Sequence, residues 1–231
     1  MADQKQEQKI STLLAKKSQG DHGIPLHFRR KGNELGKGCP GSPETKAAIL
    51  FHDGMLHRWG INRRINRSLG NALIVAAMKQ NYAPAVAYCY GNGWGGLKKD
   101  RIKNEETWQA AAKEADAYGI CFLGWIKERN LVETMSNSSS KSQYKPTKEA
   151  FDLFKTAADM GNIFAYVPTG NYYLYGDGGV EKNLDKAQHY LQLAKDVGHR
   201  QAQKGLRKIE TERNRSKPSA RSKPSTEQRE D

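Results

Sequence analysis

Long apolar runs are missing from this sequence of 231 residues. No window of 18 consecutive residues is apolar, which excludes a membrane-spanning helix of ordinary length. The first residues are polar, and the short run Leu13-Leu14-Ala15 is too brief for the apolar region of a secretion signal. We therefore expect a cytoplasmic protein, with export by a signal-independent route as the alternative.

Cysteine is scarce as well, with thiols only at Cys39, Cys89 and Cys121. An odd count at wide spacing excludes a dense disulfide scaffold and a Cys-x-x-Cys zinc module. Cys89 and Cys121 lie in apolar stretches, so we expect both thiols to be buried and unreactive. His52 and His57 are five residues apart, which does not place them on one helical face as a spacing of four would. We predict no bound metal and no other cofactor.

Strand patterns are also absent, because no stretch alternates regularly between apolar and polar residues. Apolar residues recur instead at spacings of three and four, which is the period of a helix with one buried face. This period predicts short helices over residues 43–59, 68–79, 148–160 and 184–197. Gly198 follows the last of them and suits a left-handed cap. The expected fold class is all-α.

Acidic residues are too few to balance the basic ones, at 25 against 38, which leaves a net charge of +13. Most of the excess lies in the two ends, and charge on segments with little to bury favours solubility over specific binding. Residues 1–42 show no clear period, and residues 214–231 repeat Ser-Lys-Pro-Ser without any large apolar side chain. We expect flexible basic ends, a folded domain over 43–213 and a polar loop at 136–143.

Small residues recur in a fixed register, first seen as Ala157, Gly161 and Ala165. The same spacing returns as Ala, Gly and Ala at 194, 198 and 202. It returns earlier as Ala, Ala and Gly at 111, 115 and 119, and as Ala, Asn and Ala at 77, 81 and 85. Small side chains allow antiparallel helices to approach closely where they cross. We interpret the chain as an α-solenoid of three to four stacked helix pairs.

Two glycine-rich segments repeat as well, one at 90–100 and one at 175–183. Both run from an aromatic residue through glycines, one aliphatic residue and lysine to an Asp or Asn that can cap the next helix. Glycine permits a positive φ in such a turn, and we expect Leu97 and Val180 to hold the loops on the core. The glycines at 91, 93 and 96 formally match a dinucleotide fingerprint, but they follow a helix-like run where that motif requires a strand.

One segment carries a family resemblance. The run Gly170-Asn-Tyr-Tyr-Leu-Tyr-Gly, followed by Asp185-Lys-Ala and closed by Gly198-His199, resembles the Sel-one-like repeat, a relative of the tetratricopeptide repeat. Residues 148–161 are similar to the second helix of a preceding unit, and weaker matches lie near 76–96 and 111–124. Pro168 departs from the family pattern, since proline is tolerated in a first turn but kinks a helix interior. The resemblance implies a non-catalytic adaptor or scaffold that binds another protein on the concave face of its superhelix.

Two sets of residues are candidate contacts. We predict that aromatic residues of the first helices line the partner-binding surface, and these are Trp125, Tyr172 and Tyr175. The densest basic cluster consists of Arg58, Arg63, Arg64 and Arg67. It suits phosphate contacts, or else it forms a solvated turn between two helices. The alternative function is therefore a nucleic-acid-associated protein that uses its basic ends. No nucleophile–base pair stands out, so we predict neither catalytic residues nor enzyme activity.

Overall fold

The computed structural model describes residues 45–135 and 146–216, which form helices and no strands in these two ranges. The expected all-α fold class is therefore confirmed for this part of the chain. The helices are α3 Lys46–Trp59, α4 Arg67–Met78, α5 Ala83–Asn92, α6 Arg101–Lys113, α7 Ala117–Met135, α8 Lys148–Asp159, α9 Tyr166–Tyr175, α10 Leu184–Asp196 and α11 Ala202–Ser216, with a short 3-10 turn η1 Asp177–Gly179 before α10. The expectations for residues 1–42, for the loop at 136–143 and for the tail beyond 216 fall outside the described residues.

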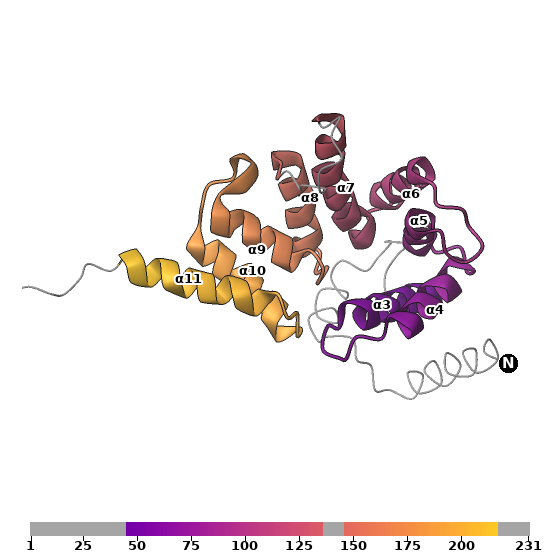
Figure 1. The fold of residues 1–231 in the computed structure, drawn as a ribbon, viewed down its shortest axis with the longest axis horizontal. Coiled ribbons are helices and arrows are strands. Elements are labelled where there is room, and N and C mark those ends of the chain that lie inside the picture. Colours follow the sequence, from indigo (N-terminus) through magenta and orange to yellow (C-terminus); the bar gives the residue numbers. More distant parts are fainter. Residues whose placement is uncertain (1–44, 136–145, 217–231) are drawn as a thin grey trace, which may run out of the picture.

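Consecutive helices pack as antiparallel pairs, and the pairs stack on one another. The pairs are α3 with α4, α5 with α6, α7 with α8 and α9 with α10, while α11 packs on α10 and α9. Figure 1 shows the helices following one another along an arc from α3 to α11. This stack is the solenoid that the small-residue register predicts, with four pairs in the described ranges. None of the helices described here is both long and apolar enough to cross a membrane.

The register of small residues corresponds to one repeated backbone joint. The middle residue of each triplet has a left-handed backbone, with φ of +56° at Asn81 and Ala115, +88° at Gly161 and +82° at Gly198. At Gly161 the backbone N–H donates to the Ala158 carbonyl at 2.9 Å, and the next N–H donates to the Ala157 carbonyl at 2.9 Å. The other three joints make the same two hydrogen bonds. Each second helix therefore ends in a Schellman motif that turns the chain into the next pair.

The glycine-rich loops behave as expected. Each loop has three glycines with positive φ, at 93, 95 and 96 in the first and at 176, 178 and 179 in the second. Each loop also closes with one equivalent backbone bond. The Asp100 N–H donates to the Tyr90 carbonyl at 3.0 Å, and the Asn183 N–H donates to the Tyr173 carbonyl at 2.8 Å. Val180 is buried, which fixes the second loop on the core.

Glycines mark two points where neighbouring helices cross, one within a pair and one between two pairs. A Cβ on Gly54 of α3 would lie 2.8 Å from the Gly70 carbonyl oxygen of α4. A Cβ on Gly119 of α7 would lie 2.6 Å from a backbone nitrogen of α6. These distances are shorter than van der Waals contact allows, so the crossings require residues without a side chain. Pro168 is the third residue of α9 and stays within its first turn, where the helix loses no backbone hydrogen bond.

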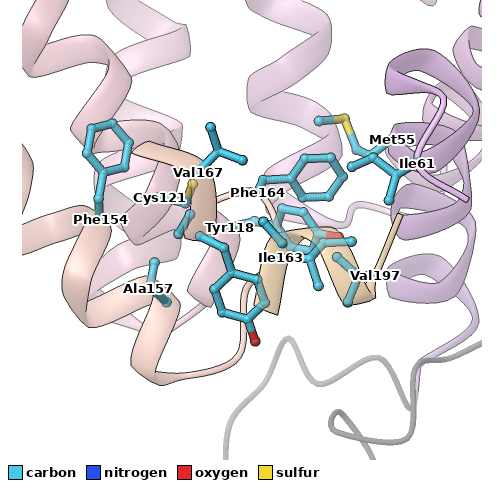
Figure 2. Close-up of a cluster of buried hydrophobic side chains, with 14 of the residues drawn as sticks. Met55, Ile61, Tyr118, Cys121, Phe154, Ala157, Ile163, Phe164, Val167 and Val197 are labelled. Atoms are coloured by element: carbon cyan, nitrogen blue, oxygen red, sulfur yellow. The ribbon is translucent and has the colours of Figure 1, made fainter. Parts of the chain in front are cut away.

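The inner side of the arc is filled by a buried cluster that joins its two ends. Met55 and Ile61 of the first pair lie in this cluster with Phe164 before α9 and Val197 after α10 (Figure 2). The Asn62 N–H donates to the Gly198 carbonyl at 3.4 Å, so the loop after α3 contacts the turn before α11. The stack therefore curves until its first and last described pairs touch.

Candidate interaction surface

Two of the predicted aromatic contacts, Trp125 and Tyr172, pack on the same ring, that of the buried Phe154. Trp125 of α7 is half-buried and packs edge-on against Phe154 of α8, with ring centroids 5.0 Å apart. Tyr172 of α9 packs against the same ring at 6.1 Å and is only 4% exposed. These two residues offer a partner little ring surface, and their packing joins α7, α8 and α9.

The Tyr172 hydroxyl connects three segments of the chain. It donates to Oε1 of Glu128 at 2.6 Å and accepts the Thr147 N–H at 3.1 Å. Burial raises the pKa of the Glu128 carboxyl, the Tyr172 hydrogen bond opposes that rise, and the nearby Asp177 adds to it. Burial also raises the pKa of Tyr172, and its bond to Glu128 adds to that rise. The tyrosine therefore stays a neutral donor that anchors α7 and the start of α8 to α9.

Tyr175 differs from its two companions because it faces outward. It is the last residue of α9 and is 53% exposed. The following Gly176 takes a left-handed conformation and its N–H donates to the Tyr172 carbonyl at 2.9 Å, which fixes the end of the helix. Of the three predicted aromatic contacts, Tyr175 presents the most accessible ring on a well-held backbone.

The basic cluster contains one arginine that is held by the protein itself. The Arg58 guanidinium lies over the ring of Trp94 at 4.6 Å and over the ring of Tyr88 at 5.6 Å. Its Nε donates to the Tyr88 hydroxyl at 3.3 Å, and its Nη1 donates to Oδ1 of Asn71. We call these four residues the arginine–tryptophan cluster. It joins the C-terminal end of α3, the first half of α4, α5 and the loop after α5.

The other three arginines lie in and beside the link between α3 and α4. Arg63 is partly exposed, with Nη1 3.9 Å from Oδ1 of the buried Asp53. Arg64 and Arg67 are exposed, and within the described residues neither makes an ion pair. Arg67 is the first residue of α4, one helical turn before Asn71. Arg67 therefore lies on the same face of α4 as Asn71, which accepts from Arg58, while Arg63 lies beside the buried carboxylate of Asp53.

Sequence reasoning missed how far this basic character extends. No Asp or Glu occurs between Asp53 and Asp100, and we call residues 54–99 the acid-free region. Besides the arginine cluster it contains Lys79, Lys98 and Lys99, all of them exposed. Summing charge over fixed segments hid this gap, whereas the distance between successive acidic residues would have shown it.

A further buried polar group, the Asp116 carboxyl, stabilises the start of a helix. Asp116 precedes α7, and its Oδ1 accepts the N–H groups of Tyr118 at 2.8 Å and Gly119 at 3.0 Å. Its Oδ2 accepts the Tyr82 hydroxyl at 3.0 Å. Burial raises the pKa of Asp116, and its hydrogen bonds oppose that rise. This carboxyl is a helix cap that also joins two helix pairs.

The cysteines and histidines show no reactive arrangement among the described residues. Cys89 and Cys121 are fully buried, as expected, and burial raises the pKa of Cys89 to about 11 and that of Cys121 further. Both thiols are therefore protonated at neutral pH and poor nucleophiles. His199 lies in the turn after α10, where burial lowers its pKa. No group of His, Cys, Asp and Glu in the described ranges is arranged to hold a metal ion.

Comparison with known proteins identifies the repeat. The Sel1 repeat model matches residues 81–103, 145–162 and 169–199. No curated protein sequence matches the chain. A solved Sel1 repeat protein from Oxalobacter formigenes is similar over 71% of this chain, with 20% identity and a TM-score of 0.43. A protective antigen with an SLR fold from uropathogenic Escherichia coli is similar over 64%, with 22% identity and a TM-score of 0.38. The similar regions span 44% and 30% of those two chains.

Proposed function

We propose that this chain, which carries Sel1 repeats, acts as a non-catalytic adaptor or scaffold that binds another protein in the cytoplasm. Sel1 repeats generally mediate protein–protein interactions. The observation that carries the proposal is the joint repeated at residues 81, 115, 161 and 198, which stacks helix pairs into one continuous surface. The buried polar groups described above support it, because Asp116, Glu128 and Tyr172 hold helices together.

Tyr175 is the contact residue that we favour on this surface. Rigid, exposed aromatic side chains supply much of the binding energy at protein interfaces. Tyr175 meets this description because its ring is exposed while its backbone is fixed by the Gly176 cap. Trp125 and Tyr172 support the same region from inside, through Phe154.

The test compares Tyr175→Ala with Ile102→Ala, which removes another exposed large side chain from a different helix pair. Affinity purification and mass spectrometry with the unaltered chain identify a partner, whose dissociation constant is then measured for each variant. We expect Tyr175→Ala to weaken binding by about thirtyfold, the loss typical of an interface hot spot. Ile102→Ala should bind as the unaltered chain does.

Circular dichroism of both variants separates binding from folding. Unchanged helicity is expected, because the Tyr175 side chain makes no hydrogen bond to the described part of the chain and is about half exposed to solvent. A loss of helicity in Tyr175→Ala would make it a core residue instead. A purification that recovers no specific protein would contradict the adaptor proposal itself.

A further inference from the structure

The chemistry of the first two helix pairs points to the kind of segment they bind. Building on the proposed adaptor function, we propose that Arg58 and Arg67 form a docking site for an acidic peptide segment of the partner protein. The site consists of the arginine–tryptophan cluster and the start of α4, and it lies within the acid-free region.

Arg58 is arranged in advance for such a contact. Its guanidinium rests on two rings and donates to Tyr88 and Asn71, so its orientation is set before any ligand arrives. It remains partly exposed, and among the described residues it has no carboxylate partner. An arginine held in this way loses little side-chain entropy on binding, and its planar fork matches a carboxylate.

Arg67 is placed where a cation is unfavourable in the free protein. It is the first residue of α4, and the first turn of that helix contains no acidic residue. The N-terminal end of a helix carries partial positive charge, so an arginine there is destabilising. A carboxylate bound between Arg67 and Arg58 would neutralise positive charge at the helix end and on the two guanidinium groups.

The surroundings add attraction over a longer range. Within the described part of the acid-free region, Arg64, Lys98 and Lys99 are exposed and make no ion pair. Unbalanced charge of one sign raises the rate at which a chain of opposite sign arrives. The second half of the arc contrasts with this arrangement, since Lys148 and Lys155 on α8 and Lys182 before α10 each contact a carboxylate.

The rings of the cluster favour a peptide over a single-stranded nucleic acid. Base stacking requires an aromatic face that is open to solvent. Arg58 covers Trp94, and Tyr88 packs against Trp94 and against Phe122, with centroids 5.7 Å apart in both pairs. The cluster therefore offers charge and hydrogen-bond donors without a free stacking platform.

The experiment measures binding of a labelled glutamate-rich peptide at an ionic strength of about 0.15 M. A peptide of the same length with glutamine in place of glutamate is the probe control. The test variant is Arg67→Glu, and Arg207→Glu, at an exposed position of α11, makes the same charge change outside the site. An acidic residue in the first turn favours the helix, so Arg67→Glu should fold. We expect it to weaken binding by about tenfold or more, while Arg207→Glu changes it by less than about twofold.

Three outcomes overturn the inference. They are no binding of the glutamate peptide, equal weakening by Arg67→Glu and Arg207→Glu, and tighter binding of a single-stranded oligonucleotide of matched length and salt. The last outcome would identify a nucleic-acid site. If the partner found by purification still binds Arg67→Glu normally, the acidic-peptide site is wrong and the adaptor function stands. If purification finds no specific partner, the adaptor function fails on its own test.

Discussion

The joints after α4 and α6 use different residues from the joints after α8 and α10, although their backbones are alike. Asn81 and Ala115 take the left-handed conformation in the first half of the arc, and Gly161 and Gly198 take it in the second half. A non-glycine residue there costs about 1 to 2 kcal/mol. Both kinds of joint make the same pair of hydrogen bonds. Packing of the stacked pairs therefore imposes the turn, and glycine makes it easier.

The residue that follows each joint explains how the first half of the arc tolerates a left-handed backbone at Asn81 and Ala115. Asp116 and Asn162 occupy equivalent places, and each accepts the N–H two residues later, at 2.8 Å and 2.9 Å. Asp116 also receives the hydroxyl of Tyr82, which follows the Asn81 joint. The first two joints are thus linked by a side-chain hydrogen bond. Within the described residues, Nδ2 of the buried Asn162 has no such partner.

The largest effect in this comparison is expected for Gly198→Ala. The φ of +82° strains any other residue, and the new Cβ would lie 2.9 Å from the Asn62 nitrogen. Strain and overlap together should lower the free energy of unfolding by about 3 kcal/mol. Denaturant unfolding measures the loss, and hydrogen exchange at Asn62 reports whether the contact between the first and last pairs opens. Unchanged exchange at Asn62 would contradict this explanation.

Gly161→Ala is the matched control for that experiment. Its φ is +88°, yet nothing lies within 4 Å of an added Cβ. This variant should show only the backbone strain, about 1 to 2 kcal/mol. The difference between the two variants measures how strongly the loop after α3 packs on the last joint.

Local features of the fold were predictable from the residues. Helix period and small-residue spacing depend on near neighbours, so the helices near 43–59 and 148–160 and the joints at 161 and 198 were found in advance. The contact between Asn62 and Gly198 was not predictable from the sequence. It depends on how far each helix pair is rotated relative to the one before it, summed over all the pairs between these two residues. The residues matched by the Sel1 repeat model do not include Ala115, although the same left-handed joint forms there with alanine in place of glycine.

The candidate site was predictable only in composition. The sequence shows that Tyr172 and Tyr175 share one segment, but which of them faces inward depends on how α9 lies against α7 and α8. The structure places the Tyr172 hydroxyl on Glu128 and leaves Tyr175 exposed. The contact of Arg58 with Trp94 was not predictable from the sequence either, because Trp94 belongs to another helix pair.

A smaller effect is expected when the link between the first two joints is removed by Tyr82→Phe. The buried Asp116 carboxylate loses its hydroxyl donor, which costs about 2 kcal/mol at neutral pH. The joint at Asn162 serves for comparison, because within the described residues the Nδ2 of Asn162 makes no hydrogen bond to a neighbouring joint. Denaturant unfolding of the variant and the unaltered chain, measured side by side at several pH values, gives the difference.

The pH dependence of that difference follows from the pKa of Asp116. Burial raises this pKa above its unfolded value, so the folded state holds the proton more tightly. Stability from this group is greatest at low pH and falls as pH rises from the unfolded pKa through the raised one. Removing the hydroxyl raises the folded pKa further. The decrease in the free energy of unfolding caused by Tyr82→Phe should therefore grow as pH rises. A decrease that is independent of pH would contradict this account.

The smallest effect has the opposite sign and comes from Ala115→Gly. Ala115 is exposed at φ +56°, so the change removes strain and little side-chain contact. Glycine adds entropy to the unfolded chain, which offsets part of the gain. We expect a net increase of about 0.5 to 1 kcal/mol in the free energy of unfolding, measured by denaturant titration. Destabilisation would mean that the Tyr82–Asp116 link, rather than relief of strain, determines the stability of this joint.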